Sequence, residues 1–184
     1  MRAIETIKNI WKIEDLRKRI ITTILLVLVY RAGTYVVLPG IDPQFLTQLR
    51  AQTSGGLMQL LDMFSGGAFS NASIFALGIM PYITASIVIQ LLGMALPYFQ
   101  KLQREGRRKL NQYTRYLTVF ILLIQGPTYL VNLSVQMGGA FPTDILFTIS
   151  STIILTAGSM FIMWLGERIT DRGIGNGISF IILV

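Results

Sequence analysis

The sequence has no cysteine and no histidine among its 184 residues, and charged side chains make up only 14% of it. The missing cysteines exclude disulfide frameworks and thiol nucleophiles, and the two absences together remove most zinc and haem sites, so we expect no metal and no cofactor. Soluble proteins average about a quarter charged residues. The low charge, with 52% hydrophobic residues and a mean hydropathy of +0.59, indicates an integral membrane protein.

Apolar runs divide the chain into segments long enough to cross a bilayer, which takes roughly 17 to 25 residues of helix. The expected spans, with their flanking residues, are 20–37, 72–97, 113–133 and 144–165, and a fifth begins within 174–184. The sequence therefore predicts an all-α, polytopic helix bundle in a membrane.

The first segment, 1–19, carries charges of both signs and is amphipathic. It lacks a cleavage site of small residues before the first apolar run, so we expect the first span to be retained and not removed as a signal peptide.

Lys and Arg are unevenly placed, and the net charge is +7. In a soluble domain such a charge would suggest nucleic-acid binding. Here the basic residues gather in segment 1–19, in the loop 99–112 and in the loop 166–173, whereas 38–73 contains only Arg50 and 134–143 contains none. By the positive-inside rule, the first three face the cytoplasm and the last two face outward. The basic residues of the 99–112 loop are Lys101, Arg104, Arg107, Arg108 and Lys109.

Residues 55–67 interrupt the outward stretch with a short amphipathic helix. Its apolar residues follow the i, i+3, i+4, i+7 pattern of one helix face; they are Leu57, Leu60, Leu61 and Phe64. The pair Gly66-Gly67 follows before the second span. Backbone polar groups in lipid need internal partners, so a broken helix is tolerated only where it is buried in protein or lines a wet cavity. The helix either lies on the outer leaflet or closes a funnel, and the sequence leaves both open.

Two residues inside the spans are unusual for lipid. Arg31 would cost about 2.5 to 3.5 kcal/mol at a helix centre, and we expect it to snorkel to the nearby outer interface; a partner inside the bundle is the alternative. Pro81 would remove a hydrogen bond to the carbonyl of Leu77, so we expect a kink in a helix running from Ile74 to Leu96.

Two isoleucine pairs are spaced four residues apart, Ile79 with Ile83 and Ile178 with Ile182, which places each pair on one helix face. Such pairs usually face lipid or core. They could also form a hydrophobic constriction that excludes ions by dewetting. Periodicity does not decide between these roles. The glycine-rich stretch 173–177 follows no strand and precedes no Lys-Ser or Lys-Thr, so we interpret it as a helix start and not as a phosphate loop.

Several strings together resemble the SecY family, which forms the central subunit of the bacterial protein-translocation channel. They are 62–68 (DMFSGGA), 72–83 (ASIFALGIMPYI), 89–92 (IQLL), 106–109 (GRRK), 112–116 (QYTRY), 163–167 (MWLGE) and 172–179 (RGIGNGIS). The resemblance runs from about Ile13 to the last residue. It implies the first half of a ten-helix channel built from two pseudo-symmetric, inverted five-helix halves.

The resemblance also implies roles for particular residues. Ile79, Ile83, Ile178 and Ile182 would belong to the pore ring, and Thr84 with Gln90 would border the lateral gate. Segment 55–67 would be the plug, with Gly66 and Gly67 as its hinge. The implied partners are the subunits SecE and SecG, the SecA ATPase and the ribosome at the cytoplasmic side, signal peptides and secretory polypeptides, membrane lipid, and the C-terminal half of SecY. The implied location is the bacterial plasma membrane, with a cytoplasmic N-terminus.

Two other functional classes compete with a protein channel. A small-solute secondary transporter also uses broken helices, but such sites usually hold polar or acidic groups at midplane, and the four complete spans contain no Asp or Glu between their ends. An intramembrane enzyme would need a serine-histidine pair, paired aspartates or a zinc motif. The sequence therefore predicts a channel subunit and not an enzyme.

Overall fold

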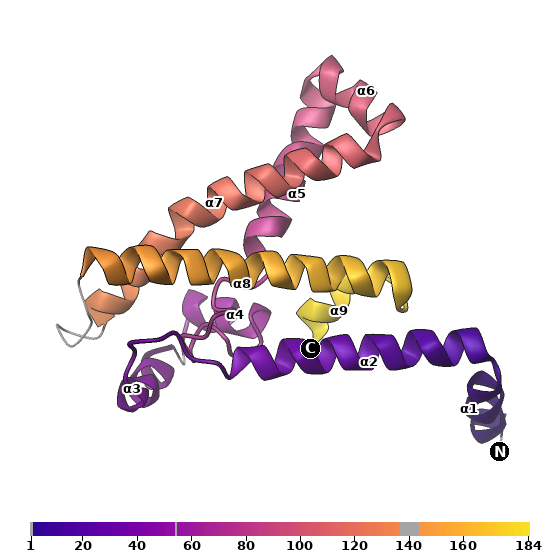
Figure 1. Cartoon of the computed structure of the whole chain (residues 1–184), viewed down its shortest axis with the longest axis horizontal. Coiled ribbons are helices and arrows are strands. Elements are labelled where there is room, and N and C mark those ends of the chain that lie inside the picture. The colour runs from indigo at the N-terminus through magenta and orange to yellow at the C-terminus, as the bar shows by residue number, and fades with distance from the viewer. Residues whose placement is uncertain (1, 54, 137–143) are drawn as a thin grey trace.

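A computed structural model describes residues 2–53, 55–136 and 144–184, and these residues fold into helices joined by turns, with a longer irregular segment at 65–79 (Figure 1). The helices are α1 (Arg2–Lys12), α2 (Glu14–Thr34), α3 (Pro43–Thr53), α4 (Leu57–Phe64), α5 (Met80–Ala95), α6 (Pro97–Glu105), α7 (Arg107–Gln136), α8 (Ile145–Arg172) and α9 (Gly177–Leu183). The predicted all-α fold is confirmed. Most of the expected outward loop 134–143 lies outside the described residues.

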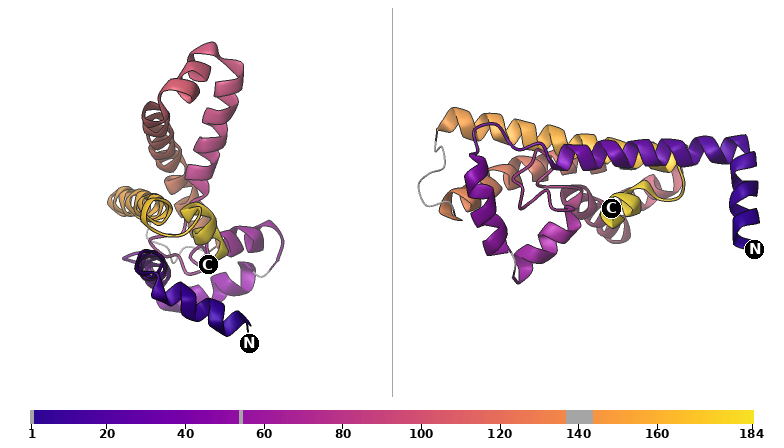
Figure 2. Two further views of the ribbon diagram at one scale, coloured as in Figure 1. Left: turned by 90° about the vertical axis from the view of Figure 1, so that its right-hand side faces the viewer. Right: turned by 90° about the horizontal axis from the view of Figure 1, so that it is seen from below.

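The long helices form the frame of the molecule. α8 lies between α2 and α7, α7 packs in turn against α5, and α9 folds back against α8 (Figures 1 and 2). α7 and α8 are each long and apolar enough to cross a membrane, and α5 with α6 would make a third if that bent pair were one span. α2 carries the expected first span but does not pass the same criterion, since its apolar residues share the helix with basic ones.

The second span begins later than expected. Residues 74–79 are turns, and α5 starts at Met80 with Pro81 in its first turn. A helix does not use the N–H groups of its first turn, so proline fits there without loss of a hydrogen bond. Gly78 just before it has a φ of +58°, which a right-handed helix cannot continue through. The expected kink at Pro81 and the helix starting near residue 72 are therefore wrong.

The two segments expected as cytoplasmic loops are mainly helical. Segment 99–112 belongs to α6 and to the first turns of α7, which meet at Gly106. The chain bends by 112° between α5 and α6, because Leu96 is extended before Pro97, as residues preceding proline usually are. Likewise α8 continues through most of 166–173 and ends at Arg172. Amphipathic segment 1–19 divides into α1 and the start of α2.

Two apolar clusters hold the frame together. One joins the turns after α2 and α4 to α7 and α8 through side chains such as Leu38, Tyr129 and Leu155. The other joins α2, α8 and α9 around Ile162 and Ile181. Both include residues of segment 65–79, so the irregular stretch between α4 and α5 lies in the core of the molecule.

Candidate functional site

The C-terminus of α4 is closed by two backbone hydrogen bonds. The N–H of Gly67 donates to the carbonyl of Asp62 at 2.9 Å, and the N–H of Gly66 donates to that of Met63 at 3.2 Å. This is the Schellman arrangement, in which the last carbonyls of a helix find partners. It requires a left-handed residue after the helix, and Gly66 and Gly67 have φ of +62° and +85°. The two glycines therefore end the helix sharply.

Two neighbouring side chains of α2 hold this helix end. The hydroxyl of Tyr30 donates to the carbonyl of Ser65 at 3.1 Å, and the guanidinium of Arg31 donates to the carbonyl of Gly66 at 2.9 Å. Arg31 therefore has a partner inside the protein, and our expectation that it snorkels to the outer interface is wrong. A hydrogen bond with a charged donor is stronger than a neutral one, so Arg31 is the firmer of the two attachments.

The turn after α4 is wedged between α2 and α8 by Phe75. Its ring lies so close to Gly33 of α2 that a β-carbon there would be 1.9 Å from it, and a β-carbon on Gly158 of α8 would be 2.1 Å from the carbonyl oxygen of Ile74. Phe75 also stacks between Tyr30 and Phe161, each at 6.0 Å between ring centroids. The glycines let the turn approach both helices.

Further hydrogen bonds secure the same turn from other sides. The carboxylate of Asp62 accepts the N–H of Ser70 at 2.9 Å, and the hydroxyl of Tyr129 on α7 donates to the carbonyl of Phe69 at 3.0 Å. Arg50 of α3 donates to the side-chain oxygen of Asn71. α2, α3 and α7 thus all contribute to seating α4 and the turn that follows it.

The four isoleucines expected at a constriction share one apolar cluster. Ile79 is buried, with 2% of its surface exposed, and Ile83, Ile178 and Ile182 are half-buried and pack against the same cluster. Ile79 precedes α5, whereas Ile178 and Ile182 lie on α9. The structure therefore brings together residues that are about a hundred positions apart in the chain.

The apolar stripe of α4 faces mostly away from the rest of the chain. Leu57 is 76% exposed, Leu60 54% and Phe64 43%, whereas Leu61 is half-buried. The contact side of α4 is formed by Leu61 and Met58, which line a pocket. The predicted short helix is confirmed with bounds Leu57–Phe64, but its stripe is not its packing face.

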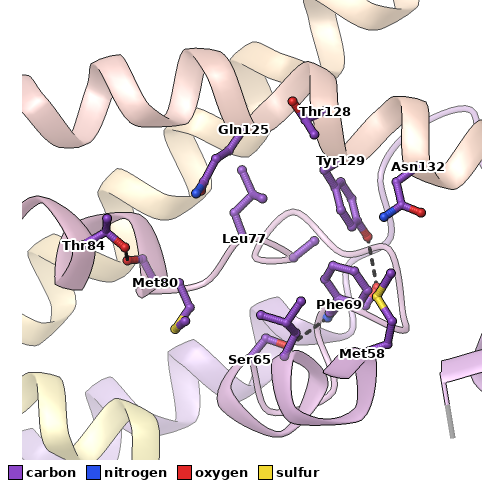
Figure 3. A pocket seen from close by; sticks show the side chains of 12 residues that line it. Met58, Ser65, Phe69, Leu77, Met80, Thr84, Gln125, Thr128, Tyr129 and Asn132 are labelled. Atoms are coloured by element: carbon purple, nitrogen blue, oxygen red, sulfur yellow. Dashed lines mark hydrogen bonds between the residues drawn. The ribbon is translucent and has the colours of Figure 1, made fainter. Parts of the chain in front are cut away.

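That pocket, of about 250 Å³, lies between α4, α5 and α7 and is shown in Figure 3. Gln125, Thr128 and Asn132 of α7 border it on one side, and Thr84 of α5 borders it on another. Apolar side chains, such as that of Leu77, dominate the remainder. No carboxylate or basic side chain lines this pocket among the described residues. The described lining is therefore uncharged, with its polar groups mainly on the α7 side.

The two residues expected at the lateral gate lie on α5, and both are exposed. The hydroxyl of Thr84 donates to the carbonyl of Met80 at 3.0 Å, and Gln90 lies farther along the helix. The pocket contains Thr84 but not Gln90, so the structure does not unite the two in one site.

The basic residues of segment 99–112 lie on the hairpin of α6 and α7. All five are exposed; they are Lys101, Arg104, Arg107, Arg108 and Lys109. The hairpin projects away from the other helices in Figure 1. Its charges are therefore accessible at one tip of the molecule.

Several residues at this site have no distinctive pattern in the sequence. Tyr30 and Phe75 were not among the predicted site residues. The adjacent pair Tyr30-Arg31 could have indicated the site, because polar groups inside an apolar span need hydrogen-bond partners. Arg115 of α7 and Glu167 of α8 form an ion pair at 2.6 Å. Their separation of 52 positions gave no local signal.

Comparison with known proteins identifies the family. A profile described as SecY matches residues 73–184. The protein translocase subunit SecY of Streptomyces galbus is 45% identical over 184 residues, covering 92% of this chain and 42% of the relative. That of Escherichia coli K12 is 45% identical over 174 residues, covering 91% of this chain and 39% of the relative, and that of Haemophilus influenzae is 46% identical over 172 residues, covering 91% and 39%. The chain spans about two fifths of the length of these relatives. With its helical membrane fold and its seated short helix, the chain belongs to the SecY family.

Proposed function

We propose that this chain forms the N-terminal half of a protein-conducting channel that passes unfolded secretory polypeptides across the bacterial plasma membrane. The curated relatives are protein translocase subunits. The observation that carries the proposal is the cluster of Ile79, Ile83, Ile178 and Ile182, which also includes residues of the segment that follows α4. Aliphatic side chains from the start of α5 and from α9 meet in this cluster.

An unfolded polypeptide carries peptide groups and charges whose exposure to hydrocarbon costs several kcal/mol each. It therefore needs a wet path, yet ions must be held back when no chain is passing. A ring of branched aliphatic side chains excludes water by dewetting and can close around a passing chain without binding any one side chain strongly. In this proposal the four isoleucines are this chain's part of that ring, and its remaining members belong to the C-terminal half.

In the same proposal α4 is the plug, with Leu57, Leu60, Leu61 and Phe64 as its apolar stripe. The exposed leucines and Phe64 support this role, because they would face the C-terminal half of SecY in the full channel. Thr84 and Gln90 on the exposed side of α5 would border the lateral gate, through which apolar segments leave for the bilayer. Segments that are apolar enough are stabilised in lipid and need no further driving force.

The proposed orientation places the N-terminus, the α6–α7 hairpin and the end of α8 in the cytoplasm, following the distribution of basic residues. SecA and the ribosome would approach from that side, and SecE and SecG would complete the complex with signal peptides and secretory chains as substrates. The proposal assigns the chain no catalytic step, so it is a channel subunit and not an enzyme.

The ring is tested by replacing Ile79 and Ile83 with glycine in the full-length protein. Reconstituted in planar bilayers, the Ile79→Gly/Ile83→Gly channel is expected to show higher resting ion conductance, because the constriction widens and wets. Ile87→Gly is the matched control for Ile83→Gly. It removes the same side chain from the same helix at a position that is 51% exposed.

Raised leak in the ring variants with an unchanged control would support the channel proposal. A resting ion conductance equal to that of the parent protein, or raised equally by Ile87→Gly, would contradict the proposed ring.

A further inference from the structure

We propose that α1 binds the surface of the bilayer and recognises anionic phospholipid headgroups. The inference starts from the arrangement of its residues around the helix axis. At roughly 100° per residue, the apolar residues of α1 fall within one arc of about 120° that contains no polar residue; they are Ala3, Ile4, Ile7, Ile10 and Trp11. The opposite side holds the polar and charged residues.

Most of the apolar arc is exposed, and only Ile10 is half-buried, at the end next to α2. Ile4 is 70% exposed, Ile7 56% and Trp11 50%, and α1 has no buried residue. Isolated helices of 11 residues are marginal in water, so this length of helix needs a surface to pack against. Among the described helices its main contacts are with α2, which follows it directly at Ile13.

The direction of α1 indicates which surface that is. In Figure 1 and in the right-hand view of Figure 2, α1 turns sharply aside from the axis of α2 at the end of that helix. If α2 crosses the membrane as the proposed first span, a helix turned sharply from its axis at its end lies along the interface. Tryptophan is enriched at that depth, since its ring is apolar and its N–H is polar.

The charges favour an anionic surface. Arg2, Lys8 and Lys12 outnumber Glu5 on the polar side of α1. The next two acids are already engaged: Glu14 pairs with Lys18 at 2.9 Å, and Asp15 pairs with Arg19 at 3.7 Å. A helix with an apolar arc and a basic polar side binds where acyl chains and anionic headgroups are both within reach.

A lipid surface fits better than a protein partner. A partner protein would need a complementary apolar surface outside the membrane. The bilayer needs no such partner, because α2 holds α1 next to the membrane that the long helices cross. Which leaflet is bound depends on the cytoplasmic orientation proposed above; the lipid contact itself does not.

The test uses tryptophan fluorescence, since the chain has only two tryptophans. Trp164→Phe leaves Trp11 as the sole tryptophan in the otherwise intact chain. This protein is reconstituted into phosphatidylcholine vesicles with or without phosphatidylglycerol. Quenching is then measured with lipids spin-labelled near the headgroup or near the acyl terminus, and with aqueous acrylamide.

We expect strong quenching by the shallow lipid label, weak quenching by the deep label and by acrylamide, and greater lipid quenching with phosphatidylglycerol. Ile7→Asn should lose most of the lipid quenching. Thr6→Asn, on the polar side of the same helix, is the matched control and should retain it. Lys8→Gln with Lys12→Gln should abolish the effect of phosphatidylglycerol.

Quenching by acrylamide alone would show that α1 lies in water, and shielding from both quenchers would show that protein covers it; either result overturns the proposal. Equal lipid quenching with and without phosphatidylglycerol would overturn the recognition of anionic headgroups. The quenching measurements do not require a conducting channel. A negative result would therefore contradict the lipid contact of α1 without contradicting the proposed channel function.

Discussion

At the scale of single residues, Tyr30 and Arg31 connect the first long helix to the end of α4. Their donors reach the carbonyls of Ser65 and Gly66, which are the groups that a helix C-terminus and its following turn leave without helical partners. The charged guanidinium of Arg31 therefore has a hydrogen-bond acceptor inside the protein. This contact gives a direct way to measure how firmly α4 is held.

Arg31→Met removes the donor and keeps much of the side chain's length. Loss of a hydrogen bond with a charged donor costs about 1.5 to 3 kcal/mol, which would raise the population of unseated α4 roughly tenfold to a hundredfold. The measurement is the labelling rate of Ala68→Cys, a position with 0% exposure. The chain has no other cysteine, so labelling reports this site alone.

Arg17→Met on the same helix is the control, because Arg17 is exposed and far along α2 from the seat. Labelling of Ala68→Cys at the same rate in Arg31→Met and in the parent would contradict the attachment.

Gly33 and Gly158 have no β-carbon, and this lets α2 and α8 pack directly against Phe75 and the turn that carries it. Gly158→Ala would place a methyl group 2.1 Å from the carbonyl oxygen of Ile74, and backbone on both sides leaves little freedom to relax. We expect a loss of about 1 to 3 kcal/mol in stability, as for other overpacked sites.

The measurement is the thermal unfolding midpoint of the detergent-solubilised protein. Gly55→Ala serves as control, since a β-carbon there meets nothing within 4 Å. Equal midpoints for Gly158→Ala and the parent would show that α8 and the turn are not in close contact.

At the scale of elements, the sequence predicted the presence of helices better than it predicted the residues at which they begin and end. α4 lies within the predicted segment 55–67, because the apolar periodicity runs from Leu57 to Phe64 and the Gly66-Gly67 pair follows. α5 starts later than predicted because Gly78 and Pro81 impose local backbone geometry on an apolar run that looks continuous. The α6–α7 hairpin shows the opposite error: a charged stretch was interpreted as a loop, although Lys and Arg are good helix formers.

The junction of α8 and α9 explains the glycine-rich stretch 173–177. A β-carbon on Gly177 would lie 1.9 Å from the carbonyl oxygen of Gly166 on α8, and one on Gly173 would lie 2.4 Å from the hydroxyl oxygen of Thr23 on α2. The side chain of Asn176 accepts the N–H of Ile178 at 3.1 Å and so caps α9. The predicted helix start is confirmed, and close packing accounts for two of its glycines.

At the scale of the whole molecule, α7 sets the span of the chain. Its 30 residues correspond to roughly 45 Å of helix, which exceeds the hydrocarbon thickness of about 30 Å. α7 is therefore long enough for its two ends to reach opposite sides of a membrane. Arg107 begins the helix and Gln136 ends it.

Single cysteines at Arg107 and at Gln136 test the orientation. In inverted and right-side-out vesicles, a membrane-impermeant maleimide should label Arg107→Cys from the cytoplasmic side and Gln136→Cys from the outer side. A permeant maleimide provides the control for reactivity at each position. Labelling of both cysteines from one side would contradict the crossing of α7 and the topology built on it.

The sequence by itself determined the membrane setting, the helical class, the short helix and the family, because composition, apolar run length and strings of specific residues are properties of contiguous chain. Tertiary structure alone decided that Arg31 holds the end of α4, that Phe75 fits between two glycines, and that isoleucines from distant segments share a cluster. Those contacts join residues far apart in the chain, and their formation depends on close packing between helices, for which local periodicity carries no signal.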